Sequence, residues 1–450
     1  MGRRAGTPWA RALGVVVLIG IAASALASGA EPQGTWSEVA QIPTERNGLA
    51  AGVVSGKLYA LGGVIEVKKY QYQDTALAEV YDPTTNTWAG VAPMPTARSC
   101  LAAGVVAGKL YAVGGDSGGQ PGIGTTDKVE VYDPAMNAWA TVAPMLTARK
   151  MLAAGVVDGK LYAMGGWYQG QLLSTVERYD PATDTWDTVT PLNGTRDNLA
   201  AGVVDGKLYA LGGFDNDLNV VGTVEVYDPA TDTWTSKASM PTPRTRLAAG
   251  VVDGKLYAVG GEAAAARYDA LEVYDPANDT WAPLAPMPTA RSKLVAGVVG
   301  GKLYAVGGES GGDSFDTVEV YDPATDTWAA EAPMPTARSD LAAGVVGGKL
   351  YALGGFDSNG TNVVTVEAYN PPPSPPLPPS APKTSSAPKT PPPSSAPKME
   401  VIIGAAAGGV ALLTSLAAAI VIKRRRALYR QQTARLTMAR ASASPSLASV

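Results

Sequence analysis

Short runs of small and apolar residues alternate with polar turns along most of the chain, in an order that repeats. Residues 196–237 show one copy: LAAGVV, the turn DG, KLYALGG, a variable segment, VEVYD, the turn PATDT and a tryptophan. The small residues of LAAGVV predict an innermost strand, where neighbouring backbones crowd an axis. Asp205-Gly206 predicts a two-residue hairpin, and PATDT predicts a second turn. One copy therefore predicts four short antiparallel strands.

Seven glycine pairs mark the copies, at intervals of 47 to 52 residues: Gly62-Gly63, Gly114-Gly115, Gly165-Gly166, Gly212-Gly213, Gly260-Gly261, Gly307-Gly308 and Gly354-Gly355. Seven tryptophans share the period: Trp36, Trp88, Trp139, Trp186, Trp234, Trp281 and Trp328. Four-stranded units repeated around an axis form a β-propeller. The pattern thus predicts an all-β, seven-bladed propeller over residues 31–370, with tyrosine and tryptophan filling the wedges between sheets.

The two series are out of phase, because Trp36 precedes the first glycine pair and no repeat tryptophan follows the last one. This offset predicts that the first segment completes the last unit. Residues 34–41 are expected to supply the fourth strand of a blade whose other three strands lie within residues 338–370.

The units resemble kelch repeats. The glycine pair, the tyrosine before it, the VEVYD run and the tryptophan seven residues beyond its tyrosine carry the resemblance, from residue 36 to residue 370. The resemblance implies a propeller closed by a strand from one terminus. It also implies that peptide ligands contact the variable loop face and the start of each inner strand.

Two further series recur sevenfold and are interpreted as scaffold, joined by hydrogen bonds or ion pairs within or between blades. The arginines are Arg46, Arg98, Arg149, Arg196, Arg244, Arg291 and Arg338. The glutamates are Glu79, Glu130, Glu177, Glu225, Glu272, Glu319 and Glu367.

One blade face is expected to be uniform and the other varied. The segment between the glycine pair and the third-strand glutamate has 15 residues in the first copy and 14 in the second, but 10 or 11 elsewhere. The position two after each repeated arginine also varies, holding in turn Gly48, Cys100, Met151, Asn198, Arg246, Lys293 and Asp340. Variation within near-identical copies is typical of a surface shaped for a partner.

The candidate ligand-binding residues follow from this variation. By resemblance the preferred contacts are Asn198, Arg246, Lys293 and Asp340, joined by Met151 and Lys150 and by the loop aromatics Trp167, Tyr168, Phe214, Tyr268, Phe315 and Phe356. Aromatic side chains on loops are common at recognition surfaces. Trp167, Phe214 and Phe356 directly follow glycine pairs, so capping of the blade edge is an equally good interpretation for these three.

Both ends of the chain carry targeting signals. Residues 1–30 combine three arginines with the apolar run LGVVVLIGIAASALA and small residues after it, which predicts a cleaved signal peptide. Residues 399–422 include 22 uncharged residues from Val401 to Ile422, enough for a transmembrane helix. The basic segment 423–450 follows, so the tail is expected in the cytoplasm and the N-terminus outside. Residues 371–398, with 13 prolines, are expected to form an extended stalk.

Composition narrows the chemistry. The chain has no histidine and one cysteine, so a histidine triad, an imidazole metal site and an intrachain disulfide are all excluded. Residues 31–399 carry 39 acidic against 26 basic residues, a net charge of −13, which argues against nucleic-acid binding. No cofactor is expected. Asn193, Asn278 and Asn359 begin N-x-T sequons and are possible glycosylation sites.

These patterns predict a non-enzymatic cell-surface protein, single-pass with its N-terminus outside. Its propeller is expected to recognise an extracellular protein or glycan ligand. The alternative is an extracellular carbohydrate-active enzyme on the same scaffold. The copper site of galactose oxidase, a propeller of similar type, needs histidine ligands that this chain lacks. Paired carboxylates drawn from Asp197, Asp215, Asp217, Asp316 and Asp340 stay open as a glycosidase site.

Overall fold

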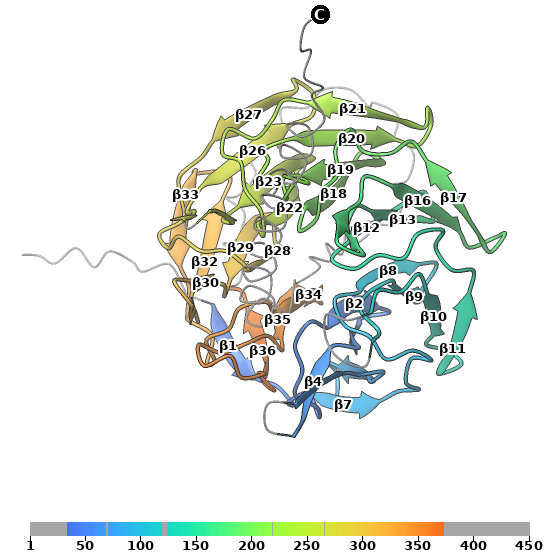
Figure 1. The fold of residues 1–450 in the computed structure, drawn as a ribbon. Helices are drawn as coiled ribbons and strands as arrows, with labels where there is room; N and C mark the ends of the chain where they lie inside the picture. Colours follow the sequence, from blue (N-terminus) through green and yellow to red (C-terminus); the bar gives the residue numbers. More distant parts are fainter. Residues whose placement is uncertain (1–33, 69–70, 119–123, 218, 265, 373–450) are drawn as a thin grey trace, which may run out of the picture.

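A computed structural model describes residues 34–68, 71–118, 124–217, 219–264 and 266–372. These residues form seven four-stranded antiparallel sheets arranged around one axis (Figure 1). The prediction of an all-β, seven-bladed propeller is confirmed. None of the described residues belongs to a helix with the length and hydropathy needed to cross a bilayer. The predicted signal peptide, the transmembrane segment, the cytoplasmic tail and nearly all of the stalk lie outside the described residues.

The first four blades follow the chain from the inner to the outer strand. Blade 1 has β2 (Ala50–Val54), β3 (Lys57–Leu61), β6 (Ala78–Asp82) and β7 (Thr87–Gly90). Blade 2 has β8 (Ala102–Val106), β9 (Lys109–Val113), β10 (Val129–Asp133) and β11 (Ala138–Val142). Blade 3 has β12 (Ala153–Val157), β13 (Lys160–Met164), β16 (Val176–Asp180) and β17 (Thr185–Val189). Blade 4 has β18 (Ala200–Val204), β19 (Lys207–Leu211), β20 (Val224–Asp228) and β21 (Thr233–Lys237).

Three more blades close the ring. Blade 5 has β22 (Ala248–Val252), β23 (Lys255–Val259), β26 (Leu271–Asp275) and β27 (Thr280–Pro283). Blade 6 has β28 (Val295–Val299), β29 (Lys302–Val306), β32 (Val318–Asp322) and β33 (Thr327–Ala330). Blade 7 has β34 (Ala342–Val346), β35 (Lys349–Leu353), β36 (Val366–Asn370) and, on its outside, β1 (Thr35–Glu38).

The N-terminal strand completes the last blade, as the stray tryptophan predicts. β1 pairs antiparallel with β36, with Trp36 opposite Tyr369, and Figure 1 shows the blue β1 beside the orange β36. The Trp36 and Tyr369 ring centroids are 5.4 Å apart. The Trp36 indole N–H donates to the carbonyl of Ala332 in the connection after blade 6, at 2.7 Å. The ring is therefore closed by residues far apart in sequence.

Close approach of neighbouring blades explains the glycine in each inner strand. A Cβ placed on Gly52 would lie 2.4 Å from Cδ1 of Leu110 in blade 2, and one on Gly344 would lie 2.7 Å from Cδ1 of Leu58 in blade 1. All seven inner-strand glycines meet the equivalent leucine of the next blade. Farther out, paired aromatic rings such as Tyr59 and Tyr132, 5.7 Å apart, fill the wedge between the sheets. The expected role of tyrosine and tryptophan is confirmed.

The repeated arginines and glutamates form buried ion pairs within each blade. Arg98 Nη2 lies 2.7 Å from Glu130 Oε2, and both side chains are fully buried. The same guanidinium also donates to the carbonyls of Ala112, Gly114 and Lys128 in its own blade. Equivalent pairs occur in the other six blades. The prediction that both series belong to the scaffold is confirmed.

The glycine pairs hold each blade against the arginine of the next one. Gly63 N–H donates to the carbonyl of Arg98 at 2.9 Å. Gly62 and Gly63 have φ of 61° and 107°, and a Cβ on Gly62 would lie 2.3 Å from that same carbonyl oxygen. A side chain at Gly62 is therefore disfavoured both by the left-handed backbone conformation and by the lack of space. The geometry recurs at five further seams between blades.

The two faces of the ring differ as expected. The first-to-second and third-to-fourth turns form one face, and six blades repeat a lysine–aspartate ion pair on it, such as Lys57 with Asp82 at 2.8 Å. The second-to-third loops and the blade-to-blade connections form the other face, called the loop face below. Among its described residues, four loops contain short hairpins: β4 (Val64–Lys68) with β5 (Gln71–Asp74), β14 (Trp167–Tyr168) with β15 (Gln171–Leu172), β24 (Glu262–Ala263) with β25 (Ala266–Arg267), and β30 (Glu309–Ser310) with β31 (Asp313–Ser314).

Trp36→Ala tests ring closure, and Trp281→Ala is its matched control. Trp281 contacts Tyr274 at 5.3 Å and donates to the Ala238 carbonyl at 2.8 Å, so its contacts match those of Trp36. We expect each substitution to lower the free energy of unfolding by about 2–4 kcal/mol, because both indoles are half-buried. Only Trp36→Ala should also speed hydrogen exchange throughout β1 and β36, since a terminal strand detaches without opening a loop. Unchanged exchange in β36 would contradict closure by β1.

Candidate functional site

The variable position two after each repeated arginine has one backbone conformation in all seven blades. Gly48, Cys100, Met151, Asn198, Arg246, Lys293 and Asp340, called the variable ring, have φ between 48° and 59°. This left-handed region costs a non-glycine residue roughly 1–2 kcal/mol. Six side chains therefore occupy a conformation that the surrounding structure must impose, which is a common feature of functional sites.

Backbone hydrogen bonds between blades impose that conformation. The N–H of Lys293 donates to the carbonyl of Arg246 at 3.1 Å, and the N–H of Asp340 donates to the carbonyl of Lys293 at 3.2 Å. The same bond runs from Arg246 to Asn198, from Cys100 to Gly48 and from Met151 to Cys100. These five bonds join Gly48, Cys100 and Met151 in one run and Asn198, Arg246, Lys293 and Asp340 in another. The side chains of the variable ring therefore differ while its backbone geometry stays the same.

A second tier of residues lies beside the variable ring. In every blade the residue after the repeated arginine forms a β-bridge with the residue after the glycine pair, as in Lys150 with Trp167, Asp197 with Phe214 and Ser339 with Phe356. Neither residue type predicts this contact, because both positions vary from blade to blade. The bridge therefore holds the first residue of each second-to-third loop against the segment that leads into the innermost strand of the same blade.

Blades 5 to 7 carry a continuous network of charges on the loop face. Arg246 Nη1 lies 2.8 Å from Glu262 Oε1, and Arg267 lies between Glu262 at 3.0 Å and Glu309 at 3.5 Å. Lys293 Nζ then contacts Glu309 Oε1 at 3.0 Å and Asp340 Oδ2 at 3.4 Å. Three preferred candidates, Arg246, Lys293 and Asp340, are therefore brought into one network.

The candidates in this network differ in accessibility. The side chain of Arg246 is 28% exposed, whereas those of Lys293 and Asp340 are 6% and 5% exposed. Arg246 is the residue best placed to contact a partner directly. Lys293 forms ion pairs with two carboxylates, Glu309 and Asp340, and mainly fixes the positions of these two groups. Asn198, the fourth preferred candidate, is half-buried on blade 4.

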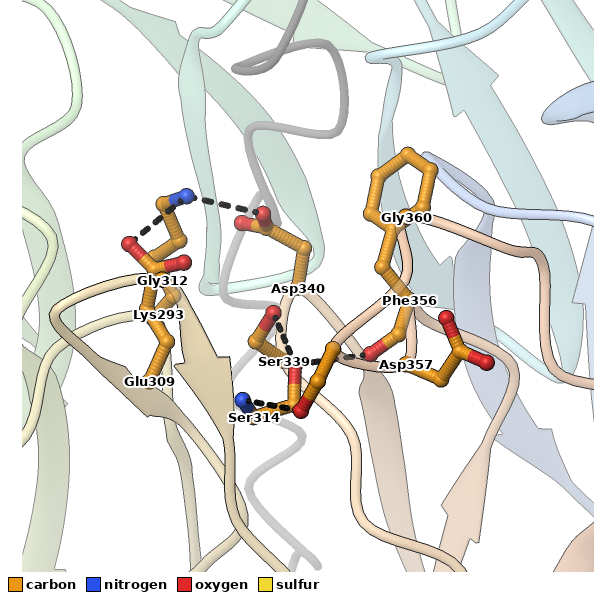
Figure 2. Close-up of a pocket in the computed structure, with 10 residues that line it drawn as sticks. Lys293, Glu309, Gly312, Ser314, Ser339, Asp340, Phe356, Asp357 and Gly360 are labelled. Carbon is orange, nitrogen blue, oxygen red and sulfur yellow. Dashed lines mark hydrogen bonds and ion pairs between the residues drawn. The ribbon is translucent and has the colours of Figure 1, made fainter.

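A pocket opens at the end of the network, between blades 6 and 7. Figure 2 shows the Lys293 ammonium group between the Glu309 and Asp340 carboxylates on one side of it. Ser314, Ser339 and Phe356 line the rest of the wall. Ser314 Oγ is 3.2 Å from Ser339 Oγ and 3.1 Å from the Phe356 carbonyl oxygen, so these groups hold the two loops together.

Blades 2 and 3 carry a separate cluster. Lys150 Nζ lies 2.8 Å from Asp116 Oδ2 and 4.8 Å from the centroid of the Trp167 ring, a cation–π distance. The Lys150 side chain is only 6% exposed. Lys150 therefore orients Trp167 more than it presents a charge, while Trp167 and Tyr168, in the hairpin β14–β15, are half-buried and partly accessible.

The remaining loop aromatics occupy repeated positions. Tyr268 and Phe315 each donate a backbone N–H to the second glycine of their pair, and their carbonyls accept from the arginine of the next blade. Phe214 and Phe356 each bridge two segments, with Asp197 and Val220 or with Ser339 and Asn362. All four side chains are half-buried. The bridges of Phe214 and Phe356 agree with the interpretation that these residues cap the blade edge, and the assignment of all four aromatics to ligand binding stays a prediction.

Two buried aspartates on the loop face have raised pKa values. Burial raises the pKa of Asp197 to about 6, against a hydrogen bond from Asn198 and the charge of Arg246. Burial likewise raises the pKa of Asp340 to about 6, opposed by Lys293 and Arg246 and assisted by the negative charge of Glu309. The Cys100 thiol is buried as well, and its pKa rises to about 12, which suits a packing residue rather than a nucleophile.

The five carboxylates considered for a glycosidase belong to three blades. Asp197, Asp215 and Asp217 lie on blade 4, Asp316 on blade 6 and Asp340 on blade 7. Asp215 Oδ1 accepts the N–H groups of Asp217 and Asn219 and so organises its own loop. Across the described ranges, no group of three or more aspartate, glutamate, cysteine or histidine side chains is arranged to hold a metal ion. The sequon residues Asn193, Asn278 and Asn359 are exposed.

Sequence reasoning missed Glu262, Arg267, Glu309 and Asp116, which pair with the candidate residues. A signal was present: the residue after the glycine pair is acidic in three copies, Asp116, Glu262 and Glu309. The left-handed backbone of the variable ring was also missed. Gly48 and Asn198 tolerate that conformation, but Met151, Arg246 and Lys293 give no hint of it.

Asp197→Asn tests the cost of burying a carboxylate on the loop face. Because its folded-state pKa of about 6 exceeds the ordinary 3.8, Asp197 favours folding below about pH 4 and loses that contribution as pH rises through 6. We expect the substitution to raise the free energy of unfolding by about 2–3 kcal/mol at pH 8 and by little at pH 4. Urea denaturation at both pH values measures this. Thr195→Ala, which lacks an ionisable group, is the control, and an equal gain at both pH values would refute the assignment.

Comparisons with known proteins agree with this architecture. The Kelch motif matches residues 45–95, 97–146 and 148–193, and the KLHDC2/KLHL20/DRC7 Kelch-repeats domain matches residues 192–355. Kelch-like protein 35 of Mus musculus is 35% identical over 132 residues, covering 29% of this chain and 22% of the relative. Kelch-like ECH-associated protein 1B of Danio rerio is 35% identical over 124 residues, covering 28% and 20%. The chain thus spans about a fifth of the length of these relatives.

A solved structure extends the likeness in fold. A copper-bound fungal alcohol oxidase of the AA5 family has a TM-score of 0.63 and 16% sequence identity, over 76% of this chain and 77% of that one. At that identity the likeness concerns the fold alone. The matched repeats run almost without a gap from residue 45 to residue 355, and the chain belongs to the kelch-repeat family.

Proposed function

We propose that this chain is a non-enzymatic binding protein of the cell surface, whose propeller recognises an extracellular protein or glycan through its loop face. The variable ring is the observation that carries the proposal. Its seven residues share one left-handed backbone geometry, and five backbone hydrogen bonds join neighbours among them, yet they present seven different residue types. Constant geometry with varied side chains is what a recognition surface requires, since only the side chains need to fit the partner.

Accessible groups next to the ring supply the contacts. Arg246 and the half-buried aromatics Trp167, Tyr168 and Phe214 belong to neighbouring blades 3, 4 and 5. Arginine and tryptophan are the residue types that most often dominate binding energy at protein interfaces. A partner that lies across these three blades would contact a cationic group and several partly exposed rings at once.

The setting outside the cell rests on the two apolar segments near the chain ends. Residues 13–27 have the length and the small-residue exit of a signal peptide. Val401 to Ile422 is followed directly by Lys423-Arg424-Arg425-Arg426, a stop-transfer pattern with the positive charge on the cytoplasmic side. The proline-rich segment 371–398 would hold the propeller clear of the membrane.

Arg246→Ala tests the binding face, with Arg178→Ala as its matched control. Arg178 is 27% exposed, against 28% for Arg246, and it too has one carboxylate partner, but it lies in β16 away from the loop face. The purified chain is first screened on protein and glycan arrays to obtain a binder. We expect Arg246→Ala to weaken that binder by about 1–2 kcal/mol, roughly five- to thirtyfold, and Arg178→Ala to leave its affinity unchanged in surface plasmon resonance. Equal affinities for both variants would reject this face.

The membrane orientation is tested by labelling intact cells with an impermeant amine-reactive biotin. Lys57 and Lys109, whose side chains are 45% and 48% exposed on the propeller, are expected to react. Lys423 should react only after the cells are permeabilised, because the proposed topology places it in the cytoplasm. Mass spectrometry identifies the labelled lysines. Labelling of Lys423 in intact cells, or of Lys57 only after lysis, would overturn the orientation.

A further inference from the structure

The pocket between blades 6 and 7 has an uneven balance of charge. Its lining includes three carboxylates, Glu309, Asp340 and Asp357, and one ammonium group, Lys293. The region from residue 31 to residue 399 also has a net charge of −13, so the surrounding field favours cations. Carboxylates thus outnumber ammonium groups among the lining residues, and Arg267 outside the lining pairs with Glu309 at 3.5 Å, which leaves Asp340 and Asp357 as the main negative groups of the pocket.

Asp340 lines this pocket with an acceptor that the protein leaves unfilled. Its side chain is 5% exposed, and its only ion pair joins Oδ2 to Lys293 Nζ at 3.4 Å. Within the described ranges Oδ1 takes part in no hydrogen bond or ion pair. Lys293 is shared with Glu309 at the shorter distance of 3.0 Å. A carboxylate oxygen that lines a pocket and has no donor within the described ranges is open to a donor from a ligand.

The other groups of the pocket limit what that donor is. The hydroxyls of Ser314 and Ser339 bond to each other, and Ser358 Oγ accepts the N–H of Ser314 at 2.9 Å. Asp357 Oδ1 accepts the N–H groups of Asn359 and Thr361. The serine hydroxyls and Asp357 Oδ1 are therefore already engaged, and the acceptors left for a ligand are carboxylates, which a cationic donor matches in charge. Phe356 adds an apolar ring to the wall, suited to the methylene stem of a long side chain.

We propose that this pocket receives one basic side chain, a lysine or an arginine, from the protein partner of the loop face. The terminal cationic group donates to Asp340 Oδ1, and the methylene stem packs against Phe356. The assignment rests on the proposed function and narrows it, because it selects a protein ligand over a glycan and a basic contact segment over an acidic one.

Binding of a cation and ionisation of Asp340 are linked. Burial raises the pKa of Asp340 to about 6, Glu309 adds to this rise, and Lys293 and Arg246 oppose it. An incoming cation stabilises the ionised carboxylate and must therefore lower that pKa. By linkage the affinity for the cation falls as pH drops through 6, since the protonated acid offers no charge.

The direct test uses small probes on the full chain. Saturation-transfer NMR titrations compare Nα-acetyl-lysine methylamide with Nα-acetyl-norleucine methylamide, which has a similar stem without the charge, and with methyl β-galactoside. We expect the lysine probe to bind at least about tenfold more tightly than the other two at pH 7.5, and to weaken several-fold at pH 5. Tighter binding of the norleucine probe or the glycoside would overturn the proposal.

Two variants locate the binding. Asp340→Asn should weaken the lysine probe about tenfold and abolish its pH dependence, because the charge is lost while the shape is kept. Asp197→Asn, at the other buried aspartate with a pKa of about 6, should leave both unchanged. Binding that is insensitive to Asp340→Asn would overturn the site. If Asp340→Asn does not fold, the pH dependence of the unaltered chain decides, and an affinity that is constant between pH 5 and 7.5 would overturn it.

The two proposals fail separately. An array partner that depends on Arg246, together with an inert lysine probe, would reject the pocket and leave the binding face. A lysine probe that depends on Asp340, together with a partner that ignores Arg246, would support the pocket and reject the binding face at blades 3 to 5.

Discussion

The rest of the propeller depends on the buried arginine that is repeated once in each blade. Its guanidinium pairs with the third-strand glutamate of its own blade and with carbonyls around it, while its carbonyl accepts from the glycine pair of the preceding blade. Burial lowers the pKa of Arg98, and the paired Glu130 offsets that shift only in part. Breaking such a pair leaves a charge unsatisfied in the interior, at a cost of about 3–5 kcal/mol. The side chain therefore stiffens one blade and the backbone joins two.

This constraint decides where variation is permitted. The glycine pair cannot change because both residues have positive φ and one touches the next arginine carbonyl. The residue after the arginine is tied by a β-bridge, but its side chain is not dictated by the repeat. Two residues after the arginine, the backbone is held in a left-handed turn while the side chain is free to differ. A rigid scaffold thus presents a ring of replaceable side chains.

Charge divides the loop face into sectors. Blades 5 to 7 share one network that runs from Arg246 to Asp340, whereas blades 2 and 3 hold the smaller Lys150 and Asp116 cluster beneath Trp167. Most charges of this network pair with one another. Arg246 is its most exposed cation, and Oδ1 of Asp340 has no partner within the described ranges. The similarity in fold to an alcohol oxidase does not indicate what chemistry this chain performs, because function depends on the side chains that a fold carries.

The sequence by itself determined the architecture and its closure. Seven copies with glycine pairs and a stray Trp36 require a ring, because each four-stranded unit must bury its faces against neighbours. It also pointed to the loop face, since copies of one repeat can be compared with each other. Only the tertiary structure decided which candidates are accessible. Lys293 and Lys150 looked like contact residues, yet both are buried against carboxylates: Lys150 against Asp116 of the neighbouring blade 2, and Lys293 against Glu309 of its own blade and Asp340 of blade 7. Those partners lie many residues away, and nothing local in the sequence encodes the seam that brings them together.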